Sequence, residues 1–109
     1  MNIRSLFEKP LEPTREEALE ELISGGRFRL ERIVSNGQAS PKGFWYDQEE
    51  SEWVVVLKGE AGLQFEGKEK PHHMKSGDHL LIPAHTKHRV QWTSATEPTL
   101  WLAVFFKEG

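Results

Sequence analysis

Two runs of apolar residues constrain the fold more than any other feature of the sequence. WVVVL at residues 53–57 and LWLAVFF at residues 100–106 show no alternation between polar and apolar side chains. Successive residues of a β-strand point to opposite faces of a sheet, so both faces of these two strands must be covered. We expect either the N-terminal segment or another subunit to cover the second face, and the sequence therefore predicts a homodimer.

The chain from residue 27 onward predicts an all-β barrel. Short apolar runs are separated by glycine, proline and asparagine, a pattern typical of strands joined by tight turns. Lys58-Gly59-Glu60 and Glu66-Gly67-Lys68 are the clearest turn signals. We predict strands at residues 28–35, 43–47, 52–57, 61–66, 72–75, 79–82, 88–92 and 99–106.

The N-terminal part of the chain predicts one helix over residues 15–24. Thr14 and Glu17 have the spacing of a capping box, and Gly25-Gly26 would end the helix. Leu19, Leu22 and Ile23 would then share one helical face. We therefore divide a single domain into an N-terminal segment with a helix at 1–26 and a β-barrel at 27–109.

Charge and composition exclude several classes of partner. The net charge is −3, with 14 basic and 17 acidic residues spread along the chain, so we expect no nucleic-acid partner. The chain has no cysteine, so neither a disulfide nor a thiolate metal ligand is available. No apolar stretch reaches the roughly 18–20 residues of a membrane span, and we see no secretory signal. We expect a cytoplasmic protein with no membrane partner.

Two segments carry a resemblance to a known family. Glu52 to Gly59, a glutamate followed by six residues and a glycine, resembles the end of the first cupin motif, His-x-His, three or four residues, Glu, six residues, Gly. GDHLLIPAHTKH at residues 77–88 resembles the second motif, in which His85 stands where glycine is usual. The resemblance covers residues 43–92 and implies a double-stranded β-helix, or jelly-roll barrel, after the N-terminal helix.

The resemblance also implies a metal site. Cupin motifs supply three histidines and one glutamate, of which Glu52 and His88 are unchanged here. Imidazole and carboxylate ligands suit Mn, Fe, Zn or Ni. We expect both side chains to point into the barrel, where a carboxylate needs a cation or hydrogen-bond donors to offset its desolvation. A hydrogen-bonded Glu52–His88 pair without metal is the alternative.

The other two ligand positions depend on the register of the first motif. Four residues before Glu52 place them at Trp45 and Asp47, whereas three place them at Tyr46 and Gln48. We prefer the first register because Asp47 could bind a metal. The predicted metal site is then Asp47, Glu52 and His88.

The predicted function is the binding of a small organic molecule in the barrel. Trp45 and Trp92 would line the pocket, and Tyr46 or Gln48 would assist. The resemblance implies a metal-dependent oxygenase, isomerase or lyase, in which the ion acts as a Lewis acid or activates water or dioxygen. The alternative is a non-catalytic binding or sensor protein without metal. The sequence identifies no catalytic residue.

Overall fold

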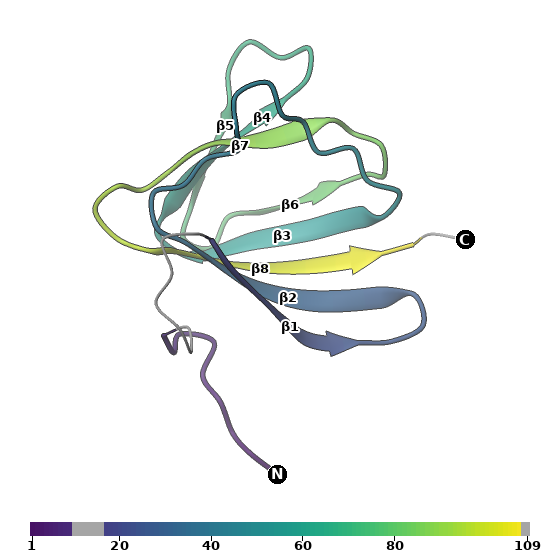
Figure 1. Ribbon diagram of the computed structural model, residues 1–109, viewed down its shortest axis with the longest axis vertical. Coiled ribbons are helices and arrows are strands. Elements are labelled where there is room, and N and C mark those ends of the chain that lie inside the picture. The colour runs from purple at the N-terminus through teal and green to yellow at the C-terminus, as the bar shows by residue number, and fades with distance from the viewer. Residues whose placement is uncertain (10–16, 108–109) are drawn as a thin grey trace.

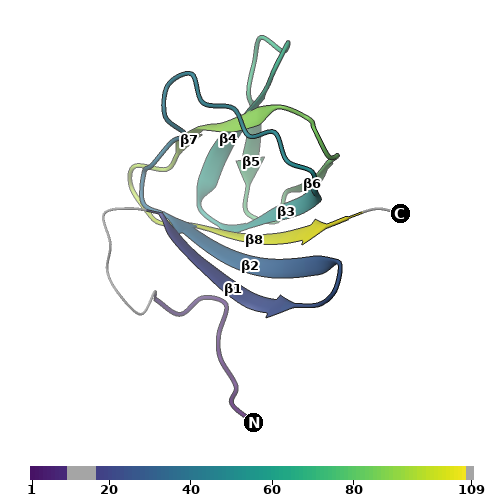
Figure 2. The same cartoon turned by 45° about the vertical axis from the view of Figure 1, so that its right-hand side comes forward.

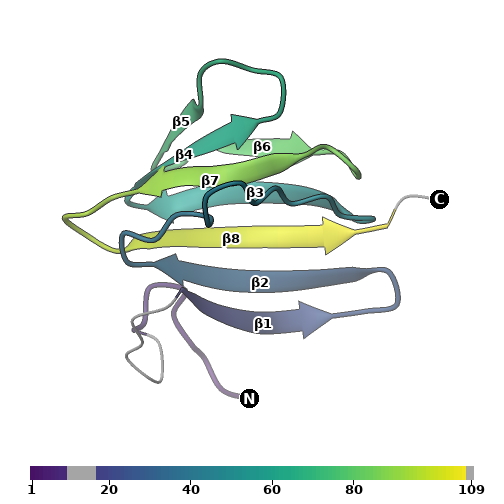
Figure 3. The same cartoon turned by 45° about the horizontal axis from the view of Figure 1, so that its top comes forward.

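Eight strands form two antiparallel sheets in the computed structural model, which describes residues 1–9 and 17–107 (Figure 1). The larger sheet has the strand order β1-β2-β8-β3-β6, and the smaller has the order β5-β4-β7. Strand β8 lies between β2 and β3, so the apolar run at 100–106 is central in its sheet (Figure 3). The strands are β1 (Ala18–Ser24), β2 (Phe28–Ser35), β3 (Ser51–Lys58), β4 (Glu60–Phe65), β5 (His72–Lys75), β6 (His79–Ile82), β7 (His88–Thr93) and β8 (Thr99–Phe106).

The predicted N-terminal helix is wrong. Residues 17–24 contain no helix, and Ala18–Ser24 forms the edge strand β1, while residues 15 and 16 lie outside the described part. Strand β1 pairs with β2 over its whole length, from Ala18 opposite Val34 to Ser24 opposite Arg29. Sheet pairing therefore overrides a helical preference that is worth only tenths of a kcal/mol per residue. Glu17, which we placed in a capping box, instead accepts a hydrogen bond from the Ser35 hydroxyl.

The two sheets face each other across the core. Figure 2 shows the smaller sheet opposite the β8-β3-β6 part of the larger one, with β1 and β2 extending beyond it. The apolar runs at 53–57 and 100–106 pair directly, with Val54 opposite Ala103. Their inner side chains form the core with residues of the facing sheet: Val54, Val56, Ala61, Leu63, Met74, Ile82, Trp101, Ala103 and Phe105.

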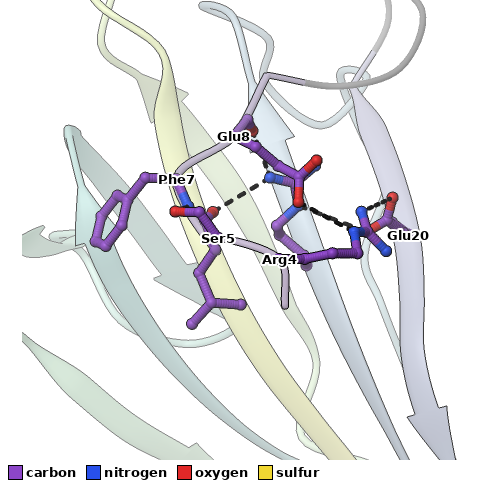
Figure 4. Close-up of polar contacts among 7 residues, drawn as sticks. Arg4, Ser5, Phe7, Glu8 and Glu20 are labelled. Carbon is purple, nitrogen blue, oxygen red and sulfur yellow. Dashed lines mark hydrogen bonds and ion pairs between the residues drawn. The ribbon is translucent and has the colours of Figure 1, made fainter. Parts of the chain in front are cut away.

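The N-terminal segment covers part of the outer face of the larger sheet. Arg32 points to this face, yet it is only 3% exposed, because its guanidinium donates to the backbone carbonyls of Leu6 and Glu8. Arg4 binds Glu8 at 3.0 Å and Glu20 of β1 at 2.9 Å (Figure 4). These contacts are with β1 and β2, so a cover on the outer faces of β3 and β8 stays a prediction.

A glycine sets the sharp turn between β3 and β4. Gly59 has a φ of +89°, a conformation that other residues rarely adopt. A Cβ at this position would also lie 2.7 Å from the Thr99 Cα and 2.9 Å from the Pro98 carbonyl oxygen. The two sheets are thus joined at a point where only glycine fits. Among the described residues, no helix is long and apolar enough to cross a membrane.

Candidate functional site

A cavity of about 270 Å³ opens between the two sheets. Its walls come from strands β2, β3, β4, β6, β7 and β8, together with residue 17, strand β1 and the segment at 46–48 that precedes β3. This volume lies slightly below the range of about 300–1,000 Å³ that is usual for small-molecule pockets. The lining residues are Glu17, Leu19, Arg29, Glu31, Ile33, Tyr46, Gln48, Glu52, Val54, Leu63, Ile82, His88, Val90, Trp101 and Phe105.

Glu52 and His88 meet in this cavity as a buried ion pair. The Nε2 atom of His88 lies 3.7 Å from Oε1 of Glu52, and the two side chains are 5% and 11% exposed. Glu52 is on β3 and His88 begins β7, so the pair links the two sheets. The predicted inward orientation of both residues is what the structure shows.

The protonation of His88 follows from its second contact. Its Nδ1 atom lies 2.8 Å from the Thr86 carbonyl oxygen, which can only accept a hydrogen bond, so Nδ1 carries a proton. The Nε2 atom faces a carboxylate and is attracted to it only when Nε2 is protonated as well. Burial lowers the pKa of His88, but the contacts with Glu52 and Thr86 outweigh burial, and the pKa is raised above its ordinary value. The contacts with Glu52 and Thr86 therefore favour the imidazolium form of His88.

The segment at 46–48 closes one side of the cavity. Tyr46 and His88 exchange two backbone hydrogen bonds, with N–O distances of 2.7 and 3.1 Å, and their rings stack at 5.4 Å. The Gln48 amide donates to Oε1 of Glu52 at 3.4 Å. Burial, followed by the charges of Glu17 and Glu52, raises the pKa of the Tyr46 phenol, which stays protonated at neutral pH. This bridge replaces the regular strand that we predicted at 43–47.

Asp47 and Trp45 do not line the cavity. Asp47 is 44% exposed, and its carboxylate pairs with Nδ1 of His85 at 2.9 Å on the surface. Trp45 lies beside the Arg89 guanidinium at 6.0 Å. Alternate residues of an extended segment point to opposite sides, so Tyr46 and Gln48 face inward when Trp45 and Asp47 do not. The structure thus places Tyr46 and Gln48 beside Glu52. These are the residues of the register that we did not prefer.

Trp92 also lies outside the cavity, although we expected it to share a face with His88. The pairing of β4 with β7 shifts by one residue, from Gly62 opposite Trp92 to Leu63 opposite Val90. This β-bulge reverses the alternation along β7, so Val90 lines the cavity while the Trp92 ring lies over Gly62 and 5.2 Å from the His73 ring. A bulge of this kind leaves no clear signal in the sequence.

The polar residues that β2 and residue 17 contribute to the cavity were not predicted from the sequence. Arg29, Glu31 and Ile33 alternate along β2 and all line the cavity. Arg29 pairs with Glu31 at 3.1 Å and with Glu50. The alternation in FRLERIVS was a usable signal for these residues. Glu17 could not be found in this way, because we assigned it to a helix.

Comparison with known proteins identifies the family. The cupin domain model matches residues 32–105. The chain belongs to the cupin domain family. A comparison with curated protein sequences gives no match.

Three solved structures share this architecture. A "putative mannose-6-phosphate isomerase" from Ralstonia eutropha JMP134 is 45% identical, with 98% of this chain and 99% of that chain covered and a TM-score of 0.92. The polyketide cyclase RemF from Streptomyces resistomycificus is 22% identical over 86% of this chain and 67% of its own, with a TM-score of 0.72. The DMSP lyase DddQ from Ruegeria pomeroyi DSS-3 is 21% identical over 84% and 47%, with a TM-score of 0.68. The two more distant likenesses concern the fold alone.

The cavity residues of this cupin do not fit a divalent transition metal. The positions of the first two cupin histidines hold Tyr46 and Gln48, so a phenol and an amide replace two imidazoles. Within residues 1–9 and 17–107, no three histidine, aspartate or glutamate side chains lie close enough together to hold an ion. Zinc and related metals take at least three such ligands from the protein. The Gln48 amide instead donates to the Glu52 carboxylate, and Nε2 of His88 lies 3.7 Å from that carboxylate.

Proposed function

We propose that this cupin binds a small organic molecule between its sheets without a resident metal ion. The observation that carries the proposal is the buried Glu52–His88 pair, which faces a cavity large enough for a small molecule but lacks two of the family's metal ligands. A proton on His88 and the Gln48 amide stabilise Glu52 where a cation would otherwise be needed. A metal-dependent reaction would require Asp47 as a further ligand, and that carboxylate is on the surface with His85.

The cavity does not favour a sugar phosphate, although the 45% identical protein is named for one. A phosphate group needs uncompensated cationic groups or backbone amides directed at it. Among the described residues that line the cavity, Arg29 is the only lysine or arginine, and it already contacts Glu31 and Glu50. We therefore infer that the substrate suggested by that name does not transfer to this chain.

A metal titration with paired variants tests the proposal. We expect no saturable binding of Zn²⁺ or Mn²⁺ to the wild-type protein in calorimetry. The double variant Tyr46→His/Gln48→His completes three inward histidines with Glu52 and gains metal binding. The matched control, Trp45→His/Asp47→His, adds the same two imidazoles on the outward side and gains no such site. Stoichiometric metal binding by the wild type that is lost in His88→Gln would refute the metal-free proposal.

A second candidate function is proton transfer to and from a bound carbonyl compound. The Glu52 carboxylate can accept a proton, and the His88 imidazolium can donate one, within a site largely shielded from water. The test is exchange of the α-protons of 4-phenyl-2-butanone in D₂O, followed by proton NMR. Exchange that the wild type accelerates and that both Glu52→Gln and His88→Gln abolish supports catalysis. Equal rates with and without protein would leave the chain as a binding protein.

A further inference from the structure

Carboxylates outnumber cationic side chains among the described residues that line the cavity. Among the described residues that line it, Glu17, Glu31 and Glu52 are acidic, whereas Arg29 and His88 are the cationic side chains. His88 pairs with Glu52, and Arg29 pairs with both Glu31 and Glu50. Glu17 is left as the carboxylate that faces the cavity and has no cationic partner in the described part of the chain.

Glu17 is held in place by a buried chain of hydrogen bonds. The Ser35 hydroxyl donates to the Glu17 carboxylate at 2.7 Å. Ser35 is fully buried and accepts a hydrogen bond from Nε1 of Trp101 at 3.1 Å. Trp101 is itself a wall of the cavity and is only 4% exposed. The Glu17 carboxylate is thus held in place by a neutral hydroxyl, which does not neutralise a carboxylate as a cation would.

Aromatic rings line the cavity together with this carboxylate. Tyr46, Trp101 and Phe105 line the same cavity, and the charges of both Glu17 and Glu52 act on the Tyr46 phenol. The face of Phe105 already carries a cation, because the Arg29 guanidinium lies 4.1 Å from its ring centre. Aromatic faces and carboxylates together attract organic cations and repel anions.

We propose that the ligand of this cavity is a small organic cation, a primary amine or quaternary ammonium on an apolar body, with Glu17 as its counter-ion. This inference rests on the proposed binding function and specifies the chemical class of the ligand. The apolar body would contact Ile33, Val54 and Leu63, and the charged group would lie near Glu17 with an aromatic ring beside it. Glu17 is thereby a specificity-determining residue of this cupin.

Three probes of nearly equal shape test the proposal, namely phenethylamine, 2-phenylethanol and phenylacetate, each titrated by calorimetry. We expect the amine to bind roughly tenfold or more tightly than the alcohol, the gain of one charge-assisted hydrogen bond, and phenylacetate to bind most weakly. Glu17→Gln should remove the preference for the amine over the alcohol. Glu21→Gln, an equal charge change at an exposed position of β1, keeps the preference.

The outcomes distinguish a failure of the cationic-ligand proposal from a failure of the proposed binding function. Binding of the alcohol and the amine with equal affinity overturns the cationic ligand but leaves the binding function standing. Failure of all three probes to bind overturns both. Should Glu17→Gln fail to fold, the salt dependence of wild-type binding decides instead, because only the amine should lose affinity as salt rises. Amine binding that does not change with salt counts against Glu17 as the counter-ion.

Discussion

Replacing Glu52 with glutamine tests the central ion pair, because the change removes a charge and keeps the shape. In the wild type, the raised pKa of His88 means that the folded state holds the proton more tightly than the unfolded chain. This contribution to stability is fully present below the ordinary histidine pKa of about 6.5 and is lost as pH rises through the raised value in the folded protein. Glu52→Gln should therefore destabilise the protein at low pH and much less at high pH.

The distance between the two groups gives the size of the effect. Two unit charges 3.7 Å apart attract by about 1 kcal/mol in water and by about 4 kcal/mol at an effective permittivity near 20. With side chains 5% and 11% exposed, the pair is nearer the second condition. Part of the attraction is offset because His88 in the variant can release its proton. We expect the free energy of unfolding to fall by about 1–3 kcal/mol near pH 5.5 and by less than about 0.5 kcal/mol near pH 9.

Urea unfolding followed by tryptophan fluorescence at the two pH values measures this difference. His88→Gln is the matched control, since a protein without the imidazole should show no pH-dependent effect of Glu52→Gln. The double variant closes a thermodynamic cycle for the pair. An equal loss of stability at both pH values would show that Glu52 stabilises the fold through packing or the Gln48 hydrogen bond alone, and would refute the imidazolium assignment.

Two further predictions concern the scaffold. Gly59→Ala places a Cβ against the backbone of Thr99 in a strained conformation, so we expect the free energy of unfolding to fall by about 1–3 kcal/mol, measured by urea unfolding, whereas Gly67→Ala has open space and should cost less. We propose that the uncovered part of the outer face, where Leu81 is 50% exposed beside Trp53, is the contact between two copies of the chain. Light scattering should show a wild-type dimer that Leu81→Glu converts to a monomer, and a monomeric wild type would contradict it.

Most of the barrel could be predicted from the sequence because strand signals and turn signals agreed. The bounds of β2, β5, β6 and β8 are those we predicted, and β3, β4 and β7 differ by one or two residues. The edge strand β1 could not be predicted, because its glutamates and leucines satisfy a helical pattern equally well. Its strand conformation depends on pairing with β2, a contact that no local pattern reveals.

The site was predictable where the motif was intact and not where a register had to be chosen. Glu52 and His88 lie together as the resemblance implied. The choice between Trp45/Asp47 and Tyr46/Gln48 depended on one residue of spacing, and one residue reverses the side to which every side chain points. Preferring Asp47 for its chemistry led us to the outward set. The backbone exchange between Tyr46 and His88 fixes the inward set, and that contact joins residues 42 positions apart.

The replacement of two histidines by Tyr46 and Gln48 changes what balances the charge of Glu52. In a cupin with three histidines and one glutamate, a bound metal ion would neutralise the carboxylate. Here a proton on His88 does so, and that proton leaves as pH rises through the raised pKa. The cavity then gains a second uncompensated carboxylate in addition to Glu17. If the ligand is a cation that stays protonated, its affinity must rise with pH, and for a neutral ligand the affinity should stay level. The same loss of two imidazole ligands that excludes a metal therefore makes the binding of cations depend on pH.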